Sequence, residues 1–256
     1  MRLQAVLFDL WGTLILDASD RSQPRQAWRA ANVQRVLMEH GADFELDAVD
    51  QALRHGMRAL GAMQDEGIDC DALGRVGIFR DELHKLTERH FDVEADAAVA
   101  LAITALHPEL SPRVEPNAVA TLAAVKALGL KTALISNTGF TTADQLRGLL
   151  DVHGLSPYLD VLVFSDELLA AKPDRRLFTH ALEALHVPAD ACVFVGDTPH
   201  NDVFGAQSAG IFAVQVRDKT HATIVPEAQI AGLEHLIDAL RAHAWLPSLE
   251  AAARDS

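Results

Sequence analysis

The chain has little of what marks a secreted, zinc-clustered or nucleic-acid-binding protein. It contains only two cysteines, Cys70 and Cys192, and neither lies in a CxxC or Cys/His cluster, so neither a disulfide framework nor a zinc site is expected. Positive charge is scarce as well, because 22 Lys and Arg stand against 36 Asp and Glu, for a formal net charge of −14. Nucleic acids are bound through clustered basic residues, so we expect no nucleic-acid partner.

The sequence also lacks a long hydrophobic run. The apolar stretch from Ala5 to Phe8 ends in the charged residue Asp9, which makes it too short for a signal peptide or a membrane span. We therefore expect no targeting segment and no membrane partner, and the two isolated cysteines are typical of a protein in the reducing cytoplasm. Hydrophobic residues make up 49% of the 256 residues, which allows either one large α/β domain or a core with a smaller inserted domain.

Short apolar segments predict a parallel sheet. Each is bounded by polar or turn residues, as in strands that are buried on both faces. From about residue 114 they alternate with helical patterns, one of which runs from Pro116 to Leu128 and is stopped by Gly129. This alternation favours an α/β fold with a Rossmann-like, doubly wound parallel sheet. The predicted strands are 4–8, 131–136, 161–165, 191–196 and 211–216.

The region between the first two predicted strands has a different character. It contains no convincing strand, and apolar residues recur at helical spacing, for example from Val33 to His40 with Gly41 as the stop. We therefore predict a helical domain inserted directly after the first strand. The expected parts are a core domain of residues 1–18 and 111–246, a helical domain of residues 19–110, and a flexible tail at 247–256.

Polar residues follow the first two strands, where reacting groups collect in an open parallel sheet. Asp9 is followed by Gly12 and Thr13, a turn whose backbone amides could approach an anion. Ser136 and Asn137 leave the second strand together and offer a hydroxyl and an amide to phosphate oxygens. Each group taken alone also has an ordinary explanation as a turn.

Two further strand ends carry charged residues. Lys172 lies directly before a proline that suits the start of a helix, where a lone lysine is usually a solvated charge. The pair Gly196-Asp197 and then Asp202 follow a very apolar strand. Carboxylates this close would repel one another unless a cation or a positive side chain offset them.

In this order, Asp9, Ser136, Lys172, Gly196-Asp197 and Asp202 resemble the motifs of the haloacid dehalogenase superfamily. One such motif is weak, but the ordered set on successive strand ends is specific. The resemblance covers nearly the whole chain, and the helical insert is similar to the helical cap domain of subfamily I in that superfamily.

The resemblance implies a hydrolase with Mg²⁺ as cofactor, in which the Asp9 carboxylate bonds covalently to the substrate and water later releases the enzyme. A small anionic molecule, phosphorylated or halogenated, is the implied substrate. The implied catalytic residues are Asp9, Ser136 and Lys172; the phosphate-binding residues are Thr13, Ser136, Asn137 and Lys172; and the metal ligands are Asp9, the backbone carbonyl of Trp11, Asp197 and Asp202.

Trp11 departs from the phosphatase pattern. Phosphatases of this superfamily usually carry an aspartate there, which protonates the leaving oxygen, and an indole cannot relay a proton. Dehalogenases instead have an aromatic residue at this place, because halide leaves without a proton. Yet the pair Gly196-Asp197 is typical of magnesium-dependent phosphatases and not of metal-free dehalogenases. The sequence therefore favours a phosphatase, with a dehalogenase as the alternative.

A non-catalytic ligand-binding protein of the same fold is a third alternative, supported only by the tryptophan. In the helical insert, Arg21 and Arg25 are candidates to clamp a substrate carboxylate, although a solvated helix-surface charge is the simpler interpretation. Trp28, His84 and His90 are interpreted as packing or surface residues. A monomer or a homodimer is expected.

Overall fold

A computed structural model describes residues 3–217, 219 and 221–246 of the chain, so the predicted tail at 247–256 lies outside the described residues. Its centre is a six-stranded sheet in the order β5-β4-β1-β6-β7-β8, in which all neighbouring strands are parallel. The strands are β1 (Ala5–Phe8), β4 (Lys131–Ser136), β5 (Val161–Phe164), β6 (Cys192–Gly196), β7 (Phe212–Val216) and β8 (Ala228–Ile230). The predicted α/β fold with a Rossmann-like parallel sheet is confirmed.

Five of these six strands coincide with the predicted apolar segments to within one residue at either end. The edge strand β8 was not predicted, because it has three residues and the side chain of its middle residue is exposed. The two-residue strands β2 (Ile15–Leu16) and β3 (Arg113–Val114) were also missed. They form a separate antiparallel pair where the chain leaves and re-enters the sheet domain.

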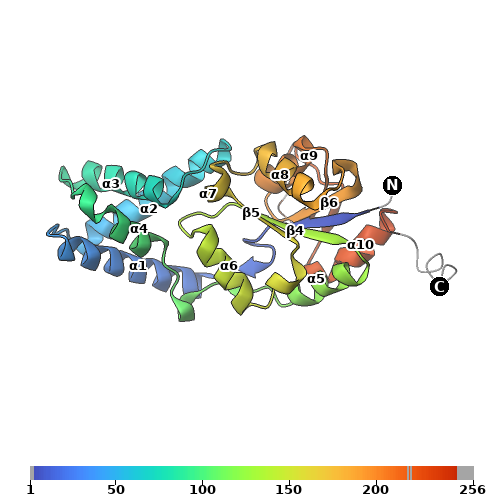
Figure 1. Ribbon diagram of the computed structural model, residues 1–256, viewed down its shortest axis with the longest axis horizontal. Helices are drawn as coiled ribbons and strands as arrows, with labels where there is room; N and C mark the ends of the chain where they lie inside the picture. Colours follow the sequence, from blue (N-terminus) through green and yellow to red (C-terminus); the bar gives the residue numbers. More distant parts are fainter. Residues whose placement is uncertain (1–2, 218, 220, 247–256) are drawn as a thin grey trace.

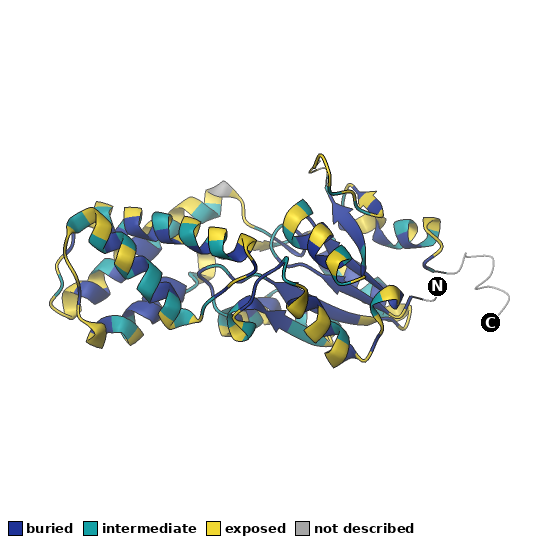
Figure 2. Ribbon diagram, turned by 90° about the horizontal axis from the view of Figure 1, so that it is seen from above, coloured by how far each residue is buried: buried dark blue, intermediate teal, exposed yellow. Residues whose placement is uncertain are grey.

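Helices cover both faces of the sheet, with α5 and α10 on one side and α8 and α9 on the other (Figure 1). Successive side chains of a strand point to opposite faces of the sheet. In β1, Val6 and Phe8 therefore pack in one apolar cluster, and Ala5 and Leu7 pack in the other. Figure 2 shows the strands as almost entirely buried. The helices on this sheet are α5 (Ala118–Ala127), α6 (Ala143–Val152), α7 (Ser165–Leu168), α8 (Arg175–Leu185), α9 (Gly205–Ser208) and α10 (Leu236–Ala242).

Four helices form a separate bundle, at the left of Figure 1. They are α1 (Ser19–Glu39), α2 (Leu46–Asp65), α3 (Ala72–Thr87) and α4 (Asp96–Thr104). The bundle has its own apolar cluster, and the cluster includes Phe140 from the loop after β4. Gly41 has a positive φ of 78° directly after α1, as a helix stop requires. Among the described residues, no helix has the length and apolar character needed to cross a membrane.

Short helical turns connect these elements. The predicted helix from Pro116 to Leu128 is shorter in the structure, because it begins at Ala118. Its stop is as predicted, since Gly129 adopts a φ of 73°. The turns are the 3₁₀ segments Val93–Ala95, Pro108–Leu110, Ser156–Tyr158, Ala189–Ala191 and Leu233–His235, and the π-helical turn Pro199–Phe204.

Candidate active site

Three strands end side by side at the candidate site. The parallel register pairs Phe8 of β1 with Leu134 of β4 and with Val195 of β6. The residues that follow these strands therefore emerge at one edge of the sheet. Asp9 leaves β1 there, next to Ser136 at the end of β4.

The Asp9 carboxylate is buried at this edge, with a relative exposure of 4%. Its backbone N–H donates to Val195 O at 2.9 Å, which fixes the residue at the end of the strand. One carboxylate oxygen, Oδ1, accepts a hydrogen bond from Lys172 Nζ at 2.6 Å. The other oxygen, Oδ2, is buried and has no hydrogen-bond partner among the described residues. Lys172 thus fixes one oxygen of the Asp9 carboxylate, and the other oxygen makes no hydrogen bond in the described residues.

Lys172 lies between two buried carboxylates. Its ammonium group donates to Asp9 Oδ1 and also to Asp202 Oδ1, at 2.7 Å. Burial alone would lower the pKa of Lys172, but Asp202 and Asp9 raise it above its ordinary value, so the side chain stays charged. Burial raises the pKa of Asp9 to about 7, although Lys172 opposes this shift.

The turn after β6 holds the two remaining carboxylates. Asp202 Oδ2 accepts the backbone N–H groups of Asp197 and Thr198, at 3.0 and 2.8 Å. Gly196 is required here because a methyl group at this position would overlap the Asp202 side chain. Asp197 accepts from the Thr198 hydroxyl at 2.9 Å and from Lys219 Nζ at 2.5 Å. The sequence reasoning missed Lys219, and its place shortly after a predicted strand was the available signal.

The donor set fits a hard divalent cation. One oxygen each from Asp9, Asp197 and Asp202 lie within 4.8 Å of one another, and all three residues are buried. Three adjacent carboxylates repel one another in a site of low polarity, and oxygen ligands are those that Mg²⁺ prefers. The loop after β1 closes over them, since a methyl group at Gly12 would overlap the Asp197 carboxylate. Trp11, whose carbonyl is the fourth expected ligand, is half-buried in this loop.

The polar residues after β4 lie at the same edge. Ser136 is fully buried, and its hydroxyl donates to Asn137 O at 3.1 Å. Asn137 holds the backbone of Lys172, because its Oδ1 accepts the Lys172 N–H at 2.8 Å and its Nδ2 donates to Lys172 O at 3.1 Å. The Thr13 hydroxyl is buried without a partner among the described residues. Asn137 therefore orders the lysine that contacts Asp9.

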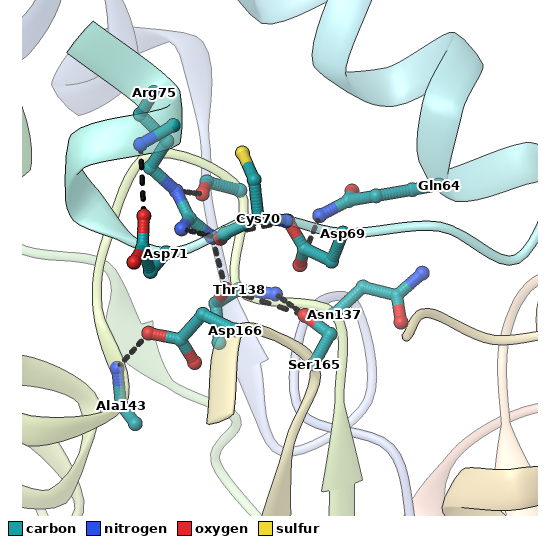
Figure 3. A network of polar contacts seen from close by, with 12 residues as sticks. Gln64, Asp69, Cys70, Asp71, Arg75, Asn137, Thr138, Ala143, Ser165 and Asp166 are labelled. Carbon is teal, nitrogen blue, oxygen red and sulfur yellow. Dashed lines mark hydrogen bonds and ion pairs between the residues drawn. The ribbon is translucent and has the colours of Figure 1, made fainter. Parts of the chain in front are cut away.

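A buried arginine of the helical bundle joins the loop after β4 (Figure 3). Arg75 of α3 has no exposed surface. Its Nη2 donates to Thr138 Oγ1 at 2.7 Å, and its Nε donates to Gly139 O at 2.6 Å. Within the bundle it pairs with Asp69 at 3.3 Å and donates to Cys70 O. The bundle is thus hydrogen-bonded to the loop that follows Ser136.

The two arginine candidates of α1 are held by the chain itself. Arg21 Nη1 donates to Glu109 O and Ser111 O, at 2.9 and 3.0 Å. Arg25 donates to Leu110 O at 2.9 Å and pairs with Asp17 at 2.5 Å. The interpretation of Arg25 as a solvated charge is wrong, because only 7% of it is exposed.

The aromatic residues of the bundle pack on one another. The ring of Trp28 meets His107 edge-on, with the centroids 5.1 Å apart, and His84 stacks on His90 at 3.9 Å. These contacts agree with the interpretation of Trp28, His84 and His90 as packing or surface residues, since the first two are partly buried and His90 is exposed. Both cysteines are free thiols.

Comparison with known proteins decides the family. The model of haloacid dehalogenase-like hydrolases matches residues 3–210, which is most of the chain. The chain belongs to this family. This haloacid dehalogenase-like hydrolase is similar to ribulose-1,5-bisphosphate 5-phosphatase of Halopiger xanaduensis, with 31% identity over 245 residues, which are 92% of this chain and 95% of the relative.

Two further similarities cover different lengths. Haloacid dehalogenase-like hydrolase domain-containing protein 3 of Danio rerio is 37% identical over 120 residues, which are 45% of this chain and 48% of the relative, so the match spans about half of that protein. The crystal structure of the 2-haloacid dehalogenase of Pseudomonas syringae pv. Tomato DC3000 superposes with a TM-score of 0.66 at 22% identity, covering 94% of this chain and 99% of the other. At this identity the likeness shows the fold alone.

Proposed function

We propose that this hydrolase is a phosphatase that acts on a small phosphorylated metabolite, with Asp9 as nucleophile and Mg²⁺ as cofactor. One observation carries the proposal: Asp9, Asp197 and Asp202 converge as buried carboxylates, and one oxygen of Asp9 has no partner among the residues that the structure describes. A free carboxylate oxygen beside a fixed ammonium group suits attack on phosphorus. The phosphatase name of the Halopiger relative supports the same class of reaction.

In the first step, Asp9 Oδ2 forms a bond to phosphorus, and the bond to the leaving oxygen breaks with its electron pair on that oxygen. This gives an aspartyl-phosphate on Asp9. Lys172 orients the nucleophile through Oδ1 and offsets the charge of the transferring group. The hydroxyl groups of Ser136 and Thr13 complete the phosphate pocket. Water then attacks the phosphorus, the bond between phosphorus and Asp9 Oδ2 breaks, and inorganic phosphate leaves while Asp9 regains its free carboxylate.

The metal ligands would be Asp9, the Trp11 carbonyl, Asp197 and Asp202. When bound, Mg²⁺ supplies positive charge that lets an anionic substrate approach these carboxylates. The Lys219 ammonium group pairs with Asp197, and the Lys219 side chain is half exposed and flexible enough to turn away from the site. Asn137 contributes indirectly, because it fixes the backbone of Lys172.

Trp11 restricts the substrates. No carboxyl group stands at this position to protonate the leaving oxygen, a step worth roughly 10²- to 10⁴-fold in rate. The best substrates are therefore those with good leaving groups, such as acyl phosphates or sugar 1-phosphates. Residues 19–110, which include the helical bundle α1–α4, form the cap domain, and this domain selects among the substrates. The two free thiols suit a reducing cytoplasm.

Trp11 also favours one other candidate, a 2-haloacid dehalogenase. In that reaction Asp9 attacks carbon and halide leaves with the bonding electrons, so that no acid is needed. The metal-binding set argues against this candidate, because carboxylates without a cation repel an anionic haloacid. Phosphoryl transfer therefore stays the preferred reaction.

The test is a phosphate-ester screen with Mg²⁺ or with EDTA, run beside a chloride-release assay on 2-chloropropionate. The proposal expects phosphate release that requires Mg²⁺ and that is lost in Asp9→Asn. Chloride release that is insensitive to EDTA would select the dehalogenase instead. Activity of Asp9→Asn equal to that of the parent would refute both reactions.

A further inference from the structure

Three arginines lie along one side of α1. Arg21, Arg25 and Arg29 are spaced by four residues, so they lie on one face of the helix. Arg21 and Arg25 donate to carbonyl groups of residues 109–111, and Arg25 also pairs with Asp17. These contacts fasten α1 to the segment that returns to the sheet, although Arg21 Nε, like Arg29 Nε, is buried without a hydrogen-bond partner in the described residues.

Arg29, one turn further along, is the exception. Only 5% of it is exposed, and its Nε is buried without a hydrogen-bond acceptor. Within the described part of the chain, no carbonyl accepts a hydrogen bond from it and no carboxylate forms an ion pair with it. Burial and the neighbouring Arg25 lower the pKa of Arg29 to about 10, although the charge of Asp17 opposes this shift, and the side chain stays a cation at neutral pH.

A neighbouring aromatic ring places this guanidinium beside the candidate site. The carbon Cζ of Arg29 lies 6.0 Å from the centroid of the Phe140 ring. Phe140 follows Ser136 by four residues, in the loop that leaves the carboxyl end of β4. Arg29 therefore lies where the helical bundle meets the phosphate-binding loop, on the side of the bundle that faces the sheet domain.

A buried cation without a partner is costly, and buried guanidinium groups are normally paired with anions. Arg25 follows that rule, since it pairs with the Asp17 carboxylate. In the described residues Asp17 pairs directly with Arg25 and acts on Arg29 only through its charge, so no carboxylate of the chain forms an ion pair with Arg29. An anion that enters between the bundle and the sheet would supply the missing partner of Arg29. A carboxylate or phosphate could accept two parallel hydrogen bonds from the planar guanidinium group.

We propose that Arg29 binds a second anionic group of the substrate, so that the preferred substrates are small phosphate monoesters that also carry a carboxylate or a second phosphate. This assignment rests on the proposed phosphatase function, because the first phosphate is placed at Asp9. It makes Arg29 a specificity-determining residue, whereas Arg21 and Arg25 hold the helix in place.

Binding of unreactive analogues tests the assignment without turnover. With Mg²⁺ present, calorimetry on the full chain compares 3-phosphonopropionate with propylphosphonate, which differ only in the terminal carboxylate. The parent should bind 3-phosphonopropionate about tenfold to a hundredfold more tightly, as expected for a charge-assisted contact. Arg29→Met should abolish this preference, and Arg29→Lys should keep part of it. Arg35→Gln, an exposed arginine of the same helix, is the matched control and should retain it.

A third ligand, propane-1,3-bisphosphonate, shows whether carboxylate or phosphate is preferred. Equal binding of 3-phosphonopropionate and propylphosphonate by the parent, or an unchanged preference in Arg29→Met, overturns the assignment. Because the ligands are not hydrolysed, the two proposals fail separately. A chain that prefers the doubly charged ligand but releases no phosphate from esters refutes the phosphatase and leaves Arg29 as an anion receptor.

Discussion

The buried arginine of α3 offers the sharpest test of how the helical bundle is joined to the sheet domain. Arg75 and Asp69 pair with no exposed side-chain surface, and Arg75 also donates to Thr138 and Gly139 across the junction. Arg75→Met removes the cation and leaves a buried carboxylate without it. Removing one partner of a buried pair costs about 3 to 5 kcal/mol of unfolding free energy. Urea unfolding followed by circular dichroism measures this loss.

The matched control is Arg54→Gln, which breaks an ion pair between Arg54 and Asp50 on the surface of α2. Exposed pairs of this kind contribute at most about 1 kcal/mol. A second substitution checks the cause, because Asp69→Asn should destabilise the parent but stabilise Arg75→Met, where it removes the unpaired charge. The reasoning is refuted if Arg75→Met loses no more stability than the control, or if Asp69→Asn has the same sign in both backgrounds.

Three other changes have defined outcomes. In Gly12→Ala the added methyl group overlaps the Asp197 carboxylate, and the backbone φ of 81° at this position is unfavourable for alanine. Calorimetry should therefore show that Mg²⁺ binding is weaker by about tenfold or more. An unchanged affinity would contradict the metal site. Burial raises the pKa of Cys192 from 9.0 to about 12. Above pH 9.0 the unfolded chain therefore loses this proton while the folded chain keeps it, and unfolding free energy falls by at most about 1.4 kcal/mol per pH unit. Cys192→Ala should show a shallower decline, and an identical decline would mean that the thiol is not buried. Trp11→Asp should raise kcat/KM on alkyl phosphates roughly tenfold or more relative to aryl phosphates, and no gain would mean that another group already supplies the proton.

The sheet could be predicted from the sequence because buried parallel strands are short, uninterrupted apolar runs. Once those runs are aligned in parallel, Asp9 and the residues that follow Val195 must emerge together, and the structure places Lys172 between Asp9 and Asp202. The strands β2, β3 and β8 could not be predicted in this way, because two or three residues are too few to establish a periodicity.

The buried cations could not be predicted, for a different reason. Arg75 and Arg29 lie on amphipathic helices, where sequence patterns assign arginine to the solvent face. Whether such a side chain is covered depends on which face another domain contacts, and that is decided by tertiary packing. Arg25 shows the same limit, because its partners Asp17 and Leu110 come from segments on either side of the bundle.

The most direct test of the account is to find the covalent intermediate on Asp9. The protein is mixed with Mg²⁺ and acetyl phosphate, quenched in acid within the first turnover, digested and analysed by mass spectrometry. The account predicts that the peptide containing Asp9 gains the mass of one phosphoryl group, and that Asp9→Asn does not. Phosphate release at full rate with no labelled peptide, or with the label on another residue, would contradict it.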